Sequence, residues 1–140
     1  MDAFELTGTV EAGKRLGTTL GFPTANVRYD PHGRAWPKEG VYVATAQLNG
    51  DGRVYVAILN QGHHPTAPGG APTVEAHLLG FGGGALYGRR ITLRYQQYLR
   101  PETKFPTLAA LQKQLERDRL AALEWARTQT GDFLNQRSLS

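Results

Sequence analysis

GVYVATAQL, residues 40–48, leads into NGDG, residues 49–52, and then into RVYVAIL, residues 53–59. The two outer stretches are rich in β-branched and aromatic residues, which favour β-strands. The Asn-Gly and Asp-Gly pairs between them are the strongest short-range signal of a hairpin turn. The sequence therefore predicts two antiparallel strands, Gly40–Leu48 and Arg53–Leu59, joined by a tight turn.

Four further short segments have strand character, and glycine- and proline-rich connections separate them. Phe4–Val10 alternates between apolar and polar residues, as a strand with one buried face does. The long connection Gln61–Pro72 is rich in Gly, Pro and His and is predicted to be a loop. The other predicted strands are Pro23–Val27, Thr73–Leu79 and Arg90–Leu99. Such short strands usually close into a barrel or pack as a sandwich, because both arrangements protect strand edges.

The end of the chain has a helical period instead. Thr107 is suited to cap the N-terminus of a helix, and Gly131 is suited to end it. Between them, apolar residues recur at helical spacing at Leu108, Leu111, Leu115 and Ala122. The sequence therefore predicts one long helix over residues 107–130, packed against the strands through its leucine stripe. Residues 1–130 are expected to form one domain, with residues 131–140 as a tail.

The composition indicates a single globular domain of modest size. The chain has 140 residues, of which 40% are hydrophobic and none is cysteine, so disulfides and thiolate metal sites are excluded. No apolar stretch approaches membrane-spanning length, and the N-terminus lacks the layout of a signal peptide. We therefore expect a cytoplasmic monomer that has no membrane partner.

The positive charge of the chain suits a nucleic acid, an anionic membrane or a phosphorylated small molecule as partner, and an ordinary solvated surface is the alternative explanation. The net charge is +4 and the isoelectric point about 9.6, but the basic residues are scattered. Local sites for a phosphorylated small molecule fit this pattern better than a continuous nucleic-acid stripe does, and no nucleic-acid partner is expected. Tyr95 and Tyr98 near Arg94 leave a small nucleic-acid-binding barrel as the less favoured alternative.

The segment Gly8–Arg15 approaches a known phosphate-binding motif without matching it. It reads GTVEAGKR, and the Walker A pattern requires Ser or Thr where Arg15 stands, followed by a helix. The loop can still bind phosphate, because Gly13 and Gly17 allow backbone N–H groups to turn towards an anion and Lys14 adds charge. An exposed glycine-rich hairpin is the alternative interpretation.

Two other patterns supply candidate ligands and a candidate base. In GFPTAN, residues 21–26, Thr24 and Asn26 lie on the same side of an extended chain and offer oxygen ligands suited to magnesium. On the predicted strand Thr73–Leu79, Glu75 and His77 share one face and the apolar residues share the other. A carboxylate on that polar face can act as a general base. The alternatives are structural roles for Thr24 and Asn26 and an ordinary surface position for Glu75.

Several motifs, taken together, resemble the riboflavin kinase family. LGTTLGFPTAN, residues 16–26, resembles the family signature, and NQGHHPT, residues 60–66, resembles its Asn-x-Gly-x-x-Pro-Thr loop. VEAH, residues 74–77, resembles the strand that carries the family's catalytic glutamate. The segments GVY (40–42), LYG (86–88) and LRPETKF (99–105) follow in the family's order. The resemblance covers residues 4–126.

The resemblance implies a mainly β fold, a six-stranded antiparallel Greek-key β-barrel with one long C-terminal α-helix. It implies a kinase that uses ATP and Mg²⁺ to phosphorylate riboflavin to FMN, with Glu75 as the catalytic base. Thr24 and Asn26 would hold the magnesium ion, and their side chains would face the same pocket as Glu75. The implied nucleotide- and flavin-binding residues are Gly13, Lys14, Gly17, Gly21, Pro23, Thr24, Asn26, His77, Arg100 and Phe105. Glu102 would lie with Arg100 and Phe105 on the flavin side, and Asp118 is expected to be structural, paired with a basic residue.

Two departures from the family pattern lie on the flavin side. Many bacterial members have aspartate where Gly80 stands, and acidic residues where Gly82–Gly84 stands. A barrel that binds flavin or nucleotide without turnover is therefore an alternative function. Nothing in the sequence resembles the FMN adenylyltransferase domain that many bacteria fuse to this kinase, so a stand-alone kinase domain without FAD synthesis is expected.

Overall fold

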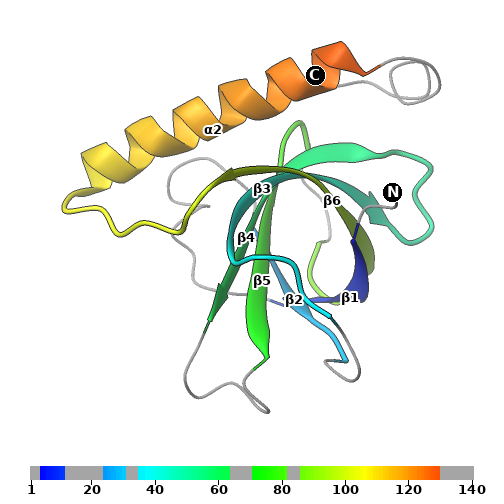
Figure 1. The fold of residues 1–140 in the computed structure, drawn as a ribbon. Helices are drawn as coiled ribbons and strands as arrows, with labels where there is room; N and C mark the ends of the chain where they lie inside the picture. Colours follow the sequence, from blue (N-terminus) through cyan, green and yellow to red (C-terminus); the bar gives the residue numbers. More distant parts are fainter. Residues whose placement is uncertain (1–3, 12–23, 31–34, 64–70, 82–85, 130–140) are drawn as a thin grey trace.

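The computed structural model describes residues 4–11, 24–30, 35–63, 71–81 and 86–129. Within these ranges the chain forms a β-barrel with a helix lying across it (Figure 1). The elements are β1 (Glu5–Glu11), β2 (Thr24–Arg28), β3 (Gly40–Leu48), β4 (Tyr55–His63), β5 (Pro72–Leu78), β6 (Arg90–Arg100) and α2 (Leu108–Thr128). The predicted tail, residues 131–140, lies outside the described residues.

The six strands form a closed antiparallel barrel in the order β1-β2-β5-β4-β3-β6. Strands β3, β4 and β5 pair in sequence, and β6 returns to lie beside β3. The resulting order β6-β3-β4-β5 is that of a Greek key. The predicted Greek-key barrel with one C-terminal helix is thus confirmed, and pairing of β1 with both β2 and β6 closes it.

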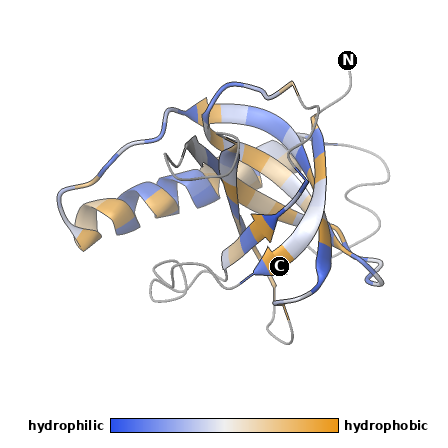
Figure 2. Ribbon diagram, turned by 90° about the horizontal axis from the view of Figure 1, so that it is seen from below, coloured by the Kyte–Doolittle hydropathy of each residue, from blue (hydrophilic) through white to orange (hydrophobic). Residues whose placement is uncertain are grey.

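Alternation along the strands produces two apolar clusters, one on each side of the barrel wall. The residues that face the interior form the main core, which includes Leu6, Leu59 and Leu93. A second cluster lies outside the wall, where Ala122 and Ala126 of α2 pack on β3 and β4. Figure 2 shows the alternation of hydrophobic and hydrophilic residues along the strands. The helix therefore covers one part of the outer surface and leaves the rest to polar side chains.

Five of the six strands begin and end within one residue of the sequence prediction, but β4 does not. It runs from Tyr55 to His63, whereas the prediction was Arg53–Leu59 with a loop from Gln61. The backbone of Asn60 and Gln61 pairs with β3 on one side and with β5 on the other. The polar composition of this stretch suggested a loop, yet pairing on both sides holds it in the sheet. At the other end, the side chain of Asp51 accepts a hydrogen bond from the Arg53 N–H at 2.9 Å, which extends the turn.

The C-terminal helix begins as the sequence predicts and ends slightly earlier. The Thr107 side chain caps it by accepting a hydrogen bond from the Ala110 N–H at 3.0 Å. The helix ends at Thr128, two residues before the predicted end, and Gly131 lies outside the described residues. The expectation that Leu108 joins the buried stripe was wrong: Leu108 is 56% exposed, because the first turn extends past the edge of the barrel (Figure 1). In the described part of the chain, no helix is long and apolar enough to cross a membrane.

Candidate active site

The pairing of β2, β5 and β4 brings the candidate catalytic residues into adjacent rows on one face of the sheet. Asn26 lies opposite Glu75, and Glu75 lies opposite Asn60. In the next row, Thr24 lies opposite His77. Residues directly opposite each other in antiparallel strands point to the same face, with Cβ atoms roughly 4.5–5.5 Å apart. The face is the outer one, because the alternating residues of β5 are buried in the barrel core.

A cavity of about 190 Å³ lies against this outer face, between the sheet and the start of α2. Glu75 and His77 line it from β5, and the segment that links β6 to α2 closes it on another side. Its lining residues are Val41, Asn60, Glu75, His77, Arg100, Glu102, Thr103, Phe105, Leu111 and Leu115. One wall is therefore polar and acidic, while Phe105 and the two leucines supply an apolar wall.

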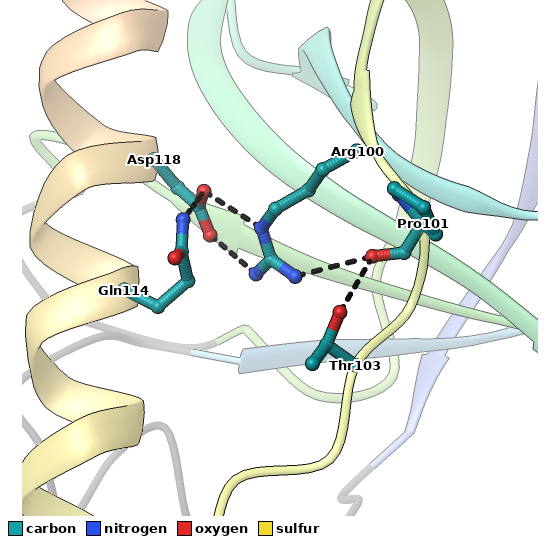
Figure 3. A network of polar contacts seen from close by, with 5 residues as sticks. All are labelled: Arg100, Pro101, Thr103, Gln114 and Asp118. Atoms are coloured by element: carbon teal, nitrogen blue, oxygen red, sulfur yellow. Dashed lines mark hydrogen bonds and ion pairs between the residues drawn. The ribbon is translucent and has the colours of Figure 1, made fainter.

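A buried ion pair joins the end of β6 to α2 (Figure 3). Arg100 donates from Nε and Nη2 to the two carboxylate oxygens of Asp118, at 3.0 and 2.7 Å. Gln114 donates to the same carboxylate at 3.0 Å, and Arg100 also donates to the Pro101 carbonyl at 3.3 Å. The Asp118 side chain is 3% exposed, and that of Arg100 is 19% exposed. The expected structural role of Asp118 is confirmed, and Arg100 lines the cavity while it holds this pair.

Next to the cavity, His77 and Thr24 form a polar pair across β2 and β5. The Thr24 hydroxyl lies 3.3 Å from Nδ1 of His77. Burial lowers the pKa of His77 to about 4, although the nearby Asp118 carboxylate acts in the opposite direction. His77 is therefore neutral at physiological pH, and a neutral imidazole can accept the Thr24 hydroxyl proton at Nδ1. That contact would fix the direction of the Thr24 oxygen.

The side chains near Glu75 could contribute a few ligands to a magnesium ion, but they could not hold a metal ion by themselves. In the ranges that the structure describes, no group of three or more His, Cys, Asp or Glu residues could hold a metal ion. Thr24 and Asn26 offer two neutral oxygens in the rows beside Glu75. Magnesium commonly takes few protein ligands and completes its shell with water and substrate phosphates. The residues present therefore fit a magnesium ion that arrives with a nucleotide.

Six of the sequence-predicted site residues can be placed, and they fall into two groups. Glu75, His77, Arg100 and Phe105 line the cavity together, with Glu102. Thr24 and Asn26 lie one strand away, directly opposite His77 and Glu75, rather than among the lining residues. The predicted phosphate-binding residues Gly13, Lys14, Gly17, Gly21 and Pro23 lie outside the described residues.

Sequence reasoning did not single out five lining residues: Val41, Asn60, Thr103, Leu111 and Leu115. Leu111 and Leu115 were assigned to the helix core alone, although they also face the cavity. Asn60 stands at the start of the NQGHHPT motif, but its segment was read as a loop. The register between β4 and β5, which places Asn60 opposite Glu75, was the missing information.

The protein is a small Greek-key barrel with a helix across its outer wall. Between the barrel and the helix lies a site in which the Glu75 carboxylate stands beside asparagine side chains. A family model described as "Flavokinase: Riboflavin kinase" matches residues 1–126. The chain belongs to the riboflavin kinase family.

Two bifunctional riboflavin kinase/FMN adenylyltransferases are among the similar curated proteins. The one from Pseudomonas fluorescens is 39% identical over 120 residues, which cover 85% of this chain and 37% of the relative. The one from Haemophilus influenzae is 35% identical over 115 residues, covering 82% and 36%. The chain thus spans a little over one third of the length of these relatives.

Solved structures support the fold assignment. A structure titled "Macrolide-efflux Protein" from Streptococcus pneumoniae has a TM-score of 0.76 and 27% identity, and the match covers 88% of this chain and 39% of that one. Riboflavin kinase from Trypanosoma brucei has a TM-score of 0.63 and covers 91% of this chain and 82% of its own. At 24% identity, the second likeness shows the shared fold alone.

Proposed function

We propose that this chain is a riboflavin kinase, which transfers the γ-phosphoryl group of ATP to the ribityl 5′-hydroxyl of riboflavin to give FMN and ADP. Family membership supports the reaction. The observation that carries the proposal is the position of Glu75, which lines a partly apolar cavity and stands opposite the amide of Asn26 on β2. Glu75, the proposed proton acceptor, therefore lies beside Asn26, the proposed magnesium ligand.

Glu75 is the general base of the proposed reaction. Its carboxylate accepts the proton of the 5′-hydroxyl while that oxygen forms a bond to the γ-phosphorus. The bond between the γ-phosphorus and the oxygen that bridges it to the β-phosphate breaks, and ADP leaves with the electron pair. Glu75 then returns its proton to solvent. Phosphoryl transfer of this kind depends on positioning and charge neutralisation more than on covalent chemistry.

The nucleotide side of the site is assigned to β2 and the residues before it. Thr24 and Asn26 would hold a magnesium ion, with the Thr24 hydroxyl oriented by His77 at 3.3 Å. When bound, magnesium neutralises charge on the phosphate oxygens. Gly13, Gly17, Gly21 and Pro23 would contact the phosphates, with Lys14 supplying positive charge.

The flavin side is assigned to the cavity beyond Glu75. Phe105, Leu111 and Leu115 supply apolar surface for the isoalloxazine ring, and Arg100 lies 5.7 Å from the centre of the Phe105 ring. The cavity, about 190 Å³, is smaller than the roughly 300–1,000 Å³ of typical small-molecule sites. We therefore expect the segment around Phe105 to move outward when flavin binds.

The proposal is tested by incubating the chain with riboflavin, ATP and MgCl₂ and separating the flavins by chromatography. FMN should form only when all three are present. Flavin binding without FMN formation would instead favour a binding module without turnover. Salt-dependent binding of single-stranded nucleic acid, with no effect of riboflavin, would favour the nucleic-acid-binding alternative.

A further inference from the structure

Asn60 has a buried side-chain acceptor that no described part of the chain satisfies. Its side-chain oxygen Oδ1 is inaccessible to solvent, and no described residue donates a hydrogen bond to it. A buried acceptor without a donor costs free energy, and native proteins retain few of them. Such a group therefore calls for an explanation, and a ligand that supplies the missing donor is one.

The position of Asn60 indicates which ligand group that is. Asn60 lies opposite Glu75 on β4, on the side of Glu75 away from Asn26. Asn60 lines the cavity with Glu75, Arg100 and Phe105, whereas Asn26 is not among the lining residues. The row Asn26–Glu75–Asn60 thus has the assigned metal side at one end and the flavin cavity at the other.

We propose that, once the segment around Phe105 has moved outward on flavin binding, Oδ1 of Asn60 accepts a hydrogen bond from a ribityl hydroxyl adjacent to the one that Glu75 deprotonates. The inference rests on the proposed function, and it gives Asn60 the role of recognising the ribityl chain of the substrate. A polyol suits this position, because it offers hydroxyl donors on neighbouring carbons that can meet neighbouring acceptors on β5 and β4. Asn60 therefore selects flavins with a ribityl chain over flavins without one.

The test compares riboflavin with lumiflavin, which has the same ring system and a methyl group in place of the ribityl chain. Dissociation constants are measured by flavin fluorescence in the presence of ADP and Mg²⁺, for the unmodified chain and for Asn60→Leu. The substitution should weaken riboflavin binding by roughly 3- to 10-fold, as expected for one neutral hydrogen bond, and leave lumiflavin binding unchanged. Asn60→Ala should act in the same direction and provides a second variant in case leucine disturbs folding.

A matched amide-to-leucine control is Gln96→Leu. Gln96 lies on β6 beside a different groove, where it donates to Thr45 at 3.3 Å. Its replacement should leave both dissociation constants unchanged. Without ligand, Asn60→Leu should also melt at or above the temperature of the unmodified chain, because it removes a buried acceptor to which no described residue donates.

Three results would overturn the proposal. Equally weaker binding of riboflavin and lumiflavin would show that Asn60 only maintains the shape of the cavity. Unchanged riboflavin binding would show that Asn60 does not contact the ligand. A lower kcat with unchanged binding would assign it to the chemical step. Failure of the proposed function is a separate result: the unmodified chain would form no FMN, while the two titrations still report on Asn60.

Discussion

Glu75 stands between two asparagines on the outer wall of the barrel, with the cavity beside it. An ordinary surface glutamate would have no such surroundings, since its strand neighbours would face bulk water. The alternation of β5 directs Val74 and Ala76 into the core, and so it fixes Glu75 on the opposite face. At this scale, the chemistry depends on a single carboxylate that the sheet holds against the cavity.

Replacing Glu75 with glutamine should remove the proton acceptor while preserving the shape of the side chain. We expect Glu75→Gln to lower kcat for FMN formation by roughly 10²–10⁴-fold, the usual contribution of a general base. The control is Glu116→Gln, an exposed carboxylate on α2 that pairs with Arg119. A rate close to that of the unmodified chain would exclude Glu75 from the chemical step.

His77 should make the free energy of unfolding depend on pH between about 6.5 and 4. Burial lowers its pKa to about 4 in the folded chain from the ordinary histidine value of 6.5, so the unfolded chain binds more protons in this window. The stabilising contribution is complete above pH 6.5 and is lost as the pH falls through 4, a change of up to roughly 3 kcal/mol. The groups facing His77 are Thr24 on β2, Glu75 on the same strand and Asp118 on α2.

Urea unfolding at several pH values measures this contribution. His77→Asn has no titrating ring, so the difference in unfolding free energy between it and the unmodified chain should shrink as the pH falls from 6.5 to 4. A difference that stays constant over this window would contradict the low pKa of His77.

Alternation along a strand predicted the faces of Glu75 and His77, because it is a local property with a period of two residues. It could not predict that Asn60 is the neighbour of Glu75. That contact depends on the register of β4 against β5, which sequence alternation leaves open. Strand pairing was also needed to locate Thr24 and Asn26. The sequence predicted them as ligands, but only the pairing of β2 with β5 shows that they lie on the strand next to the one that lines the cavity.

At the scale of elements, α2 is attached to the barrel at two places. Ala122 and Ala126 pack on β3 and β4, and Asp118 holds the end of β6 through Arg100. The helical period predicted an apolar stripe, but a charged residue takes one of the buried positions and Leu108 lies outside the contact. Helical spacing alone cannot reveal where the contact with the barrel ends, because that depends on how far the barrel reaches.

Removing the buried carboxylate should destabilise the chain more than removing an exposed one from the same helix. Asp118→Ala leaves the Arg100 guanidinium, 19% exposed, without its partner, and we expect a loss of roughly 3–5 kcal/mol in urea unfolding. Glu124→Ala breaks an exposed pair with Arg127 and should change stability little. Similar losses for both variants would show that the buried pair contributes no more than a surface pair does.

At the scale of the whole molecule, closure of the barrel was beyond prediction from local pattern. The sequence indicated short antiparallel strands, which suit a sandwich as well as a barrel, and the resemblance to a family supplied the choice. Closure requires β1 to pair with β2 and with β6, although β1 and β6 are separated by most of the chain. Such pairings depend on long-range geometry, and the composition of β1 does not specify its partners.

One glycine makes this closure testable. A side chain at Gly8 on β1 would overlap the carbonyl oxygen of Arg28 and approach Cγ1 of Val27 to 2.6 Å, so β2 can pack here only against a residue without Cβ. Because the first obstacle is backbone, Gly8→Ala should destabilise the barrel by roughly 1–3 kcal/mol or more. The matched control is Gly52→Ala in the β3–β4 turn, where an added Cβ would meet nothing within 4 Å. Thermal unfolding should show a clear fall in Tm for Gly8→Ala and little change for Gly52→Ala. Equal Tm values for the two variants would mean that β1 and β2 do not approach as closely as the barrel requires.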